Sequence, residues 1–262
     1  MVIHLAKSPR ISFHEIMDWH QRFAQQARWT AQLRSYLTKK AGIHPHHRVL
    51  EVGCGSGAVL SDFKAHPFHL GLDINFENLH LARSHIATAQ LTCGDAHHLP
   101  YPDESMDFTI CHFLLMWVNG EEAVKEMRRV TCRGGAVIAM AEPDYGGRID
   151  FPPSLAAIGI YQTQSLRDQG ADPYTGRKLR SWFRSAGLVE IETGVIGAQW
   201  QNKNIDLAEI SLEWEIIRSD LQNYLPPEEL QALETADVHS WQEGTRILFV
   251  PTFYAIGFVP RK

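Results

Sequence analysis

The sequence predicts an α/β fold built on a doubly wound parallel sheet. Two observations support this prediction. Between residues 48 and 141, short apolar runs typical of strands alternate with segments of helical periodicity. The first apolar run also opens into a glycine-rich turn, EVGCGSG, which is typical of strand–turn–helix units. Such alternation gives right-handed βαβ units and a sheet covered by helices on both faces.

The first expected element is a long helix over residues 12–41. It opens with a capping box formed by Ser12 and Glu15, and Gly42 ends its apolar periodicity. Strands and helices alternate after it. The expected strands are 48–52, 68–72, 107–112 and 135–141, and the helices between them are 57–65, 76–87 and 120–130.

After residue 142 the pattern loosens into a loop rich in glycine and proline. The remaining expected helices are 154–168, 176–186, 206–225 and one that starts in PPEEL, and the expected strands are 188–197 and 252–259. Trp214 falls on the apolar stripe of the 206–225 helix, so we expect it in the core. Trp200 and Tyr224 fall at segment ends, where a pocket role and a packing role are equally open.

The composition excludes several classes of protein. A net charge of −5 without a basic run argues against a nucleic-acid partner. The apolar run at 108–118 is too short to span a bilayer, and the start of the chain has no apolar signal segment. The four cysteines form no C-x-x-C pair. We therefore expect a cytoplasmic monomer or homodimer that binds neither nucleic acid nor membranes.

The glycine-rich turn itself predicts a ligand site. A tight turn needs one glycine, whereas Gly53, Gly55 and Gly57 together suggest a close approach to the backbone. The phosphate-binding P-loop pattern is absent, and the dinucleotide pattern is met only loosely, with Ala58 in its last position. Glu51 would place negative charge near a pyrophosphate, so it favours a ligand with a cationic end.

Two further carboxylates follow at strand ends. Asp73 closes the second strand, where it can accept hydrogen bonds from both hydroxyls of a ribose. Asp95 and the amide of Ala96 lie between the expected helix 76–87 and the expected strand 107–112, where they follow the third strand of the sheet. They therefore offer one acceptor and one donor to an adenine edge.

These motifs, E-x-G-C-G-x-G and G-D-A-x-x-L-P-x-x-D, resemble those of class I S-adenosylmethionine-dependent methyltransferases. The second motif resembles most the small-molecule enzymes of the quinone-biosynthesis type. The resemblance covers about 48–142 and extends more loosely to the end. It implies a Rossmann-like, seven-stranded sheet with six parallel strands and an antiparallel last strand.

The same resemblance implies a division of the chain. Residues 1–47 would form an N-terminal helical cap, and residues 48–262 would form the methyltransferase domain. Because the strand near 188–197 ends on the cofactor face, the long connection at about 201–247 would form a helical lid. We expect the underside of its first helix near Tyr145, and Glu213, Arg218 and Asp220 on its outer face.

The implied activity is methyl transfer from S-adenosylmethionine to a small molecule. Asp73 would bind the ribose, Ile74 would pack on the adenine, and Glu51 would lie near the amino end. Arg28 or Gln25 would reach the carboxylate of the cofactor. The full implied binding set is Arg28, Glu51, Gly53, Cys54, Gly55, Gly57, Asp73, Ile74, Asp95, Ala96, His112 and Phe113.

The catalytic residue stays open because the acceptor atom is not known. A general base is needed only for a hydroxyl or an ammonium acceptor. The candidates are His112, Glu142, Asp144 and Tyr145, although His112 could equally be a core histidine. No metal is expected, since the histidines at 44–47 lack a carboxylate or cysteine at ligand spacing. An NAD-dependent oxidoreductase and a non-catalytic cofactor-binding module are the alternatives.

Overall fold

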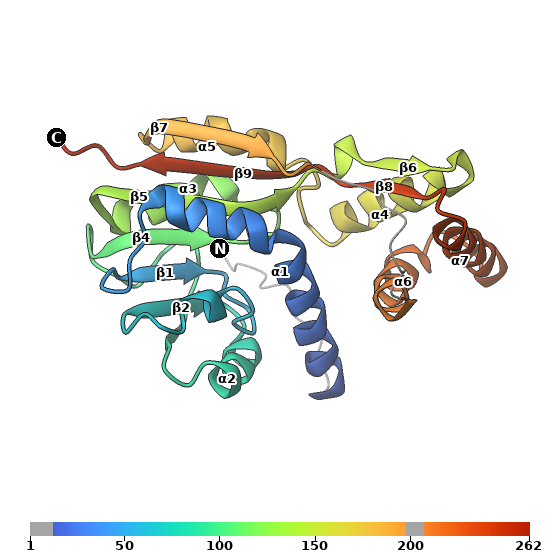
Figure 1. Ribbon diagram of the computed structural model, residues 1–262, viewed down its shortest axis with the longest axis horizontal. Helices are drawn as coiled ribbons and strands as arrows, with labels where there is room; N and C mark the ends of the chain where they lie inside the picture. Colours follow the sequence, from blue (N-terminus) through green and yellow to red (C-terminus); the bar gives the residue numbers. More distant parts are fainter. Residues whose placement is uncertain (1–12, 198–206) are drawn as a thin grey trace, which may run out of the picture.

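The computed structural model describes residues 13–197 and 207–262, with side chains from residue 20 and again from residue 208 onward. Ser12 and Trp200 therefore lie outside the described residues. A seven-stranded sheet forms the centre, in the order β3-β2-β1-β4-β5-β9-β7 (Figure 1). Its strands are β1 (Val49–Val52), β2 (His69–Asp73), β3 (Gln90–Cys93), β4 (Met106–Cys111), β5 (Thr131–Pro143), β7 (Val189–Val195) and β9 (Thr252–Phe258).

Strand direction confirms the predicted fold class. The strand pairs from β3 through β5 run parallel, whereas β9 runs antiparallel to both β5 and β7. The sheet thus has six parallel strands and an antiparallel last strand. All four residues of β1 are buried, as expected for a central strand covered on both faces.

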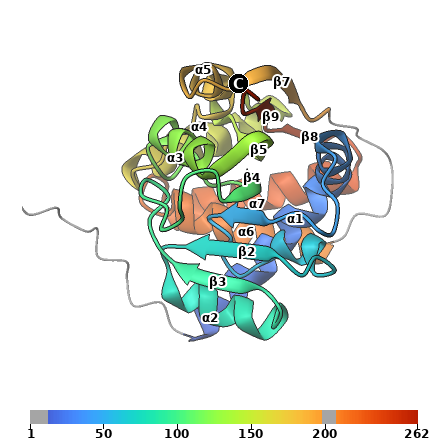
Figure 2. The same ribbon diagram turned by 90° about the vertical axis from the view of Figure 1, so that its left-hand side faces the viewer.

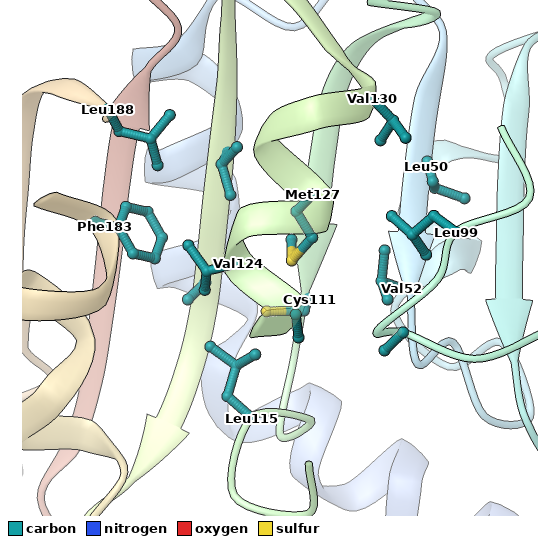
Figure 3. Packing of buried hydrophobic residues seen from close by; sticks show 14 of the residues in the cluster. Leu50, Val52, Leu99, Cys111, Leu115, Val124, Met127, Val130, Phe183 and Leu188 are labelled. Carbon is teal, nitrogen blue, oxygen red and sulfur yellow. The ribbon is translucent and has the colours of Figure 1, made fainter. Parts of the chain in front are cut away.

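Helices cover both faces of the sheet. The described helices are α1 (Phe13–Ala41), α2 (Phe76–His85), α3 (Gly120–Val130), α4 (Ala156–Asp168), α5 (Leu179–Ser185), α6 (Leu207–Leu221) and α7 (Pro227–Gln242). Figure 2 shows α3 on one face and α1 on the other. On the α3 and α5 face, Met127 and Phe183 belong to one buried cluster with sheet residues such as Val52 and Cys111 (Figure 3). On the α1 face, Leu37 packs with Val49 and Ile138.

The start of α3 follows from its sequence. The Asn119 side chain accepts a hydrogen bond from the Glu122 amide at 3.4 Å and so caps the helix. Acidic residues occupy the first turn of the helix and basic residues the last, which complements the helix dipole.

A second lobe lies beyond the carboxyl edge of the parallel strands (Figure 1). It contains α4, α6, α7 and a two-stranded ribbon of β6 (Ile149–Phe151) and β8 (Ile247–Phe249). Trp214 is fully buried there among Leu155, Ile158 and Leu221, which confirms its predicted core position. The ribbon was not predicted, because each strand is only three residues long.

Two predicted helices differ from the structure. The helix expected over 57–65 is a single 3-10 turn, Leu60–Phe63. Gly57 has a φ of +83°, so the chain is still turning where that helix was expected to begin. The segment 176–186 divides into a 3-10 turn, Gly176–Lys178, and α5. Within the described part of the chain, no helix has the length and apolar character needed to cross a membrane.

Candidate cofactor and acceptor site

The glycine turn follows β1 and is fixed to β2 by its backbone. The amides of Gly53 and Cys54 donate to the Leu72 carbonyl at 2.7 and 3.0 Å. Gly53 and Gly55 have φ values of +73° and +51°, a region that residues with a Cβ adopt at a cost. The Gly55 amide then donates to Asp73 Oδ2 at 2.8 Å. The turn and the end of β2 therefore form one rigid unit.

Asp73 is held in a fixed orientation at the end of β2. Its second oxygen, Oδ1, accepts a hydrogen bond from the Asn75 amide at 2.8 Å. Because a carboxylate offers about four acceptor positions, one remains for a ribose hydroxyl beside these two amides and the Asn78 side chain. Burial raises the pKa of Asp73, whereas these amide donors lower it. The arrangement fits the predicted ribose contact.

Glu51 is a buried carboxylate at the end of β1. It is 2% exposed, and its Oε2 has no hydrogen-bond partner among the described residues. Burial raises the pKa of Glu51 well above its usual value, and the nearby Arg34 guanidinium opposes that rise. A buried, unpaired carboxylate oxygen costs free energy unless a ligand satisfies it. The expected cationic amino end of a cofactor is a fitting partner.

Asp95 follows β3 and is bound by a histidine that the sequence did not single out. His97 donates to Asp95 Oδ1 from its amide at 2.9 Å and from Nδ1 at 2.7 Å. His97 Nε2 accepts from the Asn119 amide at 3.0 Å, which makes Nδ1 the protonated nitrogen. These bonds lower the pKa of Asp95. His97 thereby connects the end of β3 to the start of α3. Its role is visible only from this long-range contact and not from the local sequence.

The neighbours of Asp73 and Asp95 differ in exposure. The side chain of Ile74 is 67% exposed beside Asp73, whereas Ala96 is buried. An exposed apolar side chain at this edge can pack against a flat ring. Cys54 is buried in the turn, and burial raises the pKa of its thiol.

His112 and Phe113 follow β4. His112 Nε2 lies 2.8 Å from Thr30 Oγ1 of α1, and its ring packs edge-on against Phe113 at 4.4 Å. Burial lowers the pKa of His112 to about 3, with the Arg34 charge as the second cause. The imidazole is therefore neutral and already bonded. This geometry fits the core-histidine interpretation better than that of a general base.

The two carboxylates at the end of β5 already have hydrogen-bond partners. Glu142 is fully buried and accepts from the amides of Leu114 and Leu115 at 3.1 and 3.0 Å. Burial raises its pKa to about 8. Asp144 accepts two hydrogen bonds from the Arg177 guanidinium, each 2.6 Å long. Both groups thus fix loops around the site.

Tyr145 is the remaining candidate beyond β5, and it is half-buried. Its ring packs with Met116, Leu166 and Ala171. Burial raises the pKa of its phenol, and the Glu213 carboxylate of α6 adds to that rise. The hydroxyl is therefore neutral and lies within electrostatic reach of α6, as expected for the underside of the predicted lid.

Helix α1 covers the glycine turn. A Cβ placed on Gly55 would lie 3.3 Å from the Phe23 ring, and one on Gly53 would lie 2.7 Å from Leu114. His20 Nδ1 lies 2.7 Å from Ser56 Oγ. The space beside the turn is therefore lined by side chains of α1 and of the loop after β4.

Arg28 and Gln25 contact α6 and not the glycine turn. Arg28 Nη2 lies 3.0 Å from Glu209 Oε1 on the molecular surface. Gln25 Nε2 donates to the Glu209 carbonyl at 3.4 Å, and its Oε1 accepts from Arg22 Nη1 at 2.7 Å. Arg22 was not predicted, because one arginine in an amphipathic helix gives no signal of burial.

The predicted outer face of α6 is wrong for two of its three residues. Glu213 pairs with Arg22 of α1. Asp220 accepts hydrogen bonds from Gln162, Ser165 and Gln169, all on or next to α4. Both carboxylates face inward because their partners come from segments distant in the sequence. Arg218 is about half exposed and pairs with Glu234 of α7.

The histidines at 44–47 pack on one another. The rings of His46 and His47 lie 4.2 Å apart, and His47 packs edge-on against Phe108 at 5.0 Å. Among the residues that the structure describes, no group of three or more histidine, cysteine, aspartate or glutamate side chains could hold a metal ion.

Comparison with known proteins agrees with this geometry. Residues 50–139 match the family model described as a methyltransferase domain. This segment is therefore similar to a methyltransferase domain. The matched segment runs from β1 to β5 and includes the glycine turn, Asp73 and Asp95.

Two curated methyltransferases and one solved structure illustrate the similarity. The ubiquinone/menaquinone biosynthesis C-methyltransferase of Cupriavidus pinatubonensis is 29% identical over 156 residues, 56% of this chain and 59% of that protein. The demethylmenaquinone methyltransferase of Renibacterium salmoninarum is 27% identical over 188 residues, 69% of this chain and 78% of that protein. The crystal structure of YcgJ from Bacillus subtilis has a TM-score of 0.55 at 19% identity and covers 88% of this chain and 100% of that one.

These similarities confirm the predicted resemblance to class I S-adenosylmethionine-dependent methyltransferases, including the quinone-biosynthesis type. The likeness to YcgJ supports the fold. The segment that matches the family model spans about a third of the chain, and the alignment with the Cupriavidus protein spans less than two thirds of that protein.

Proposed function

We propose that this protein transfers a methyl group from S-adenosylmethionine to a small molecule. One observation carries the proposal. The glycine turn after β1 is hydrogen-bonded to Asp73, and the buried end of the same strand holds the unpaired Oε2 of Glu51. A backbone cradle, a hydroxyl acceptor and an unpaired anion match the methionine, ribose and ammonium parts of that cofactor.

When bound, the cofactor would supply a methyl group already activated by its sulfonium. The residues of this chain would bind, orient and shield it. Glu51 would accept from the ammonium group, Asp73 would hold the ribose, and Ile74 would pack on the adenine. Asp95, fixed by His97, would accept from the adenine edge with Ala96 as donor.

The acceptor would enter between the end of β5 and the second lobe. There Glu142 and Asp144 are engaged with loops, and the Tyr145 hydroxyl is the candidate that contacts the acceptor. In this proposal residues 1–47 act as a cap, 48–262 as the catalytic domain and 201–247 as a lid. We also propose a cytoplasmic monomer or homodimer with no nucleic-acid partner, consistent with the acidic net charge of −5.

Calorimetry with S-adenosylhomocysteine, S-adenosylmethionine and NAD tests the cofactor. We expect binding of the first two and none of NAD. Transfer of a labelled methyl group to a small-molecule extract then tests the activity. Binding of NAD alone would support the oxidoreductase, and binding of S-adenosylmethionine without transfer would support a non-catalytic module.

A further inference from the structure

Helices α1 and α6 are joined by an ion pair that is largely buried. The Arg22 side chain is 7% exposed and pairs with Glu213, which is 23% exposed. Arg22 Nη2 also donates to Glu213 Oε1 at 3.3 Å, and Arg22 Nη1 donates to Gln25 Oε1 at 2.7 Å. The guanidinium carbon lies 5.0 Å from the centre of the Trp29 ring. The guanidinium is thus held in one orientation by three side chains.

This pair differs from its neighbour on the same two helices. Arg28 and Glu209 are 59% and 45% exposed, as is usual for a surface ion pair. A buried pair loses hydration on both partners, so it contributes little net stability compared with apolar packing. Stability alone therefore gives a weak reason to bury Arg22 and Glu213 here.

The surroundings of Arg22 point to recognition of an oxyanion. Tyr145, whose ring packs with Met116 and Leu166 beyond β5, interacts electrostatically with both Arg22 and Glu213, and a phenol hydroxyl can donate a hydrogen bond. A guanidinium fork and a neutral phenol both donate hydrogen bonds, and together they suit a carboxylate or a phosphate. The Glu213 carboxylate itself shows that an oxyanion fits on Arg22.

The location also suits the acceptor. Phe23, the next residue of α1, is the side chain nearest to a Cβ placed on Gly55 of the glycine turn. The nearby carboxylates of Glu142 and Asp144 are bound to backbone amides and to Arg177. An anion on Arg22 would therefore lie on the helix that covers the glycine turn, where Glu142 and Asp144 already have hydrogen-bond partners.

We propose, on the basis of the proposed function, that the methyl acceptor carries a carboxylate or phosphate group that replaces Glu213 on Arg22, with the Tyr145 hydroxyl as a second donor. The anionic group of the acceptor takes the place of the Glu213 carboxylate, so that one ion pair with Arg22 replaces another. This exchange also breaks the buried ion pair between α1 and α6, so that anion binding loosens α6.

Hydrogen exchange of α6 tests the anion site without requiring turnover. The protein with S-adenosylhomocysteine is treated with benzoate, phenyl phosphate, benzyl alcohol or benzyltrimethylammonium. We expect at least one of the two anions, at millimolar concentration, to speed exchange of amides 209–217 several-fold, and the neutral and cationic probes to have no effect. Comparison of the two anions distinguishes a carboxylate from a phosphate site.

The variant Arg22→Gln should abolish this response. Arg218→Gln is the matched control, because it breaks the α6–α7 pair with Glu234 and leaves Arg22 intact. Its response to the anions should equal that of the wild type. The proposal is overturned if no anion changes wild-type exchange, if Arg22→Gln responds equally, or if Arg22→Gln binds S-adenosylhomocysteine tenfold more weakly, which would assign Arg22 to the cofactor.

The charge of the product gives a second test. With a labelled methyl donor and a small-molecule extract, the labelled product should be retained by an anion exchanger at neutral pH. Arg22→Gln should form at least tenfold less of it, and Arg218→Gln a normal amount. A neutral or cationic product would refute the anion site. A lack of any labelled product would refute the proposed function, and the exchange experiment would then decide the anion site separately.

Discussion

The cofactor half of the sheet and the second lobe are stabilised in different ways. In the first, β1 and its neighbours are buried apolar strands, and the polar groups at their ends bond to backbone amides. In the second, four charged side chains are almost fully buried together: Arg148, Asp150, Asp237 and Arg246. The first half therefore depends on apolar strands and on carboxylates bonded to backbone amides, whereas the second depends on a buried network of charged side chains.

This difference suggests that each half can be damaged separately. The four buried charged side chains should determine whether the second lobe folds and, therefore, whether the acceptor site forms. The glycine turn, Asp73 and Glu51 should control the cofactor. The following predictions test that division.

The largest effect is expected for Asp237→Ala in the lobe. Asp237 accepts from Arg246 Nε at 2.5 Å and from Trp214 Nε1 at 2.8 Å, so its loss leaves a buried guanidinium without this partner. Removing one partner of a buried pair costs about 3–5 kcal/mol of unfolding free energy. Denaturant unfolding measures the loss, and calorimetry should show S-adenosylhomocysteine affinity within about threefold of wild type.

Glu234→Ala is the control for this substitution. It breaks the pair with Arg218, which links the same two helices at a more exposed position, and should cost at most about 1 kcal/mol. Equal losses in the two variants would show that burial of the network is unimportant. A large loss of cofactor affinity in Asp237→Ala would show that the two halves are coupled.

The second effect concerns Asp73 in the cofactor half. Hydrogen bonds to a charged group contribute about 1.5–3 kcal/mol each, so Asp73→Ala should weaken S-adenosylmethionine binding at least tenfold. Asp107→Ala, which removes the pair with Arg48 at the opposite edge of the sheet, should bind normally. Unchanged affinity in Asp73→Ala, measured by calorimetry, would remove this residue from the site.

The same division explains what could be predicted from the sequence. The sheet, the glycine turn and the carboxylates at the strand ends follow from local patterns, because a parallel sheet places its strand ends at one edge. Arg22, His97 and the inward positions of Glu213 and Asp220 could not be predicted in this way. Each of these residues bonds to a partner far away in the sequence. The separation ranges from 22 residues for His97 and Asn119 to 191 residues for Arg22 and Glu213. Charged side chains are usually exposed, so nothing local indicates their burial.

A smaller effect tests whether Gly55 serves only the backbone turn or also leaves space for the ligand. Gly55→Ala and Gly42→Ala both place a Cβ at a positive φ, +51° and +71°, which should cost each variant roughly 1–2 kcal/mol of stability. At Gly42 nothing lies within 4 Å of the new Cβ, whereas at Gly55 it meets the Phe23 ring at 3.3 Å. Only Gly55→Ala should therefore weaken S-adenosylhomocysteine binding several-fold. Equal binding by both variants would mean that these glycines serve only their turns.

The smallest effect is a pH dependence that arises in the cofactor half. Burial lowers the pKa of His112 from 6.5 to about 3, so the folded protein keeps this imidazole neutral at pH values where the unfolded chain protonates it. The contribution of His112 to stability is therefore present above pH 6.5 and decreases as the pH falls toward 3, by about 1.4 kcal/mol per pH unit. In His112→Gln that decrease should be absent. The stability difference between wild type and variant should consequently change by about 1.4 kcal/mol between pH 6 and pH 5, with the wild type losing more. Since both proteins share every other titrating group, denaturant unfolding at the two pH values isolates the histidine. Parallel pH profiles would show that folding does not shift the pKa of His112, which would restore it as a candidate general base.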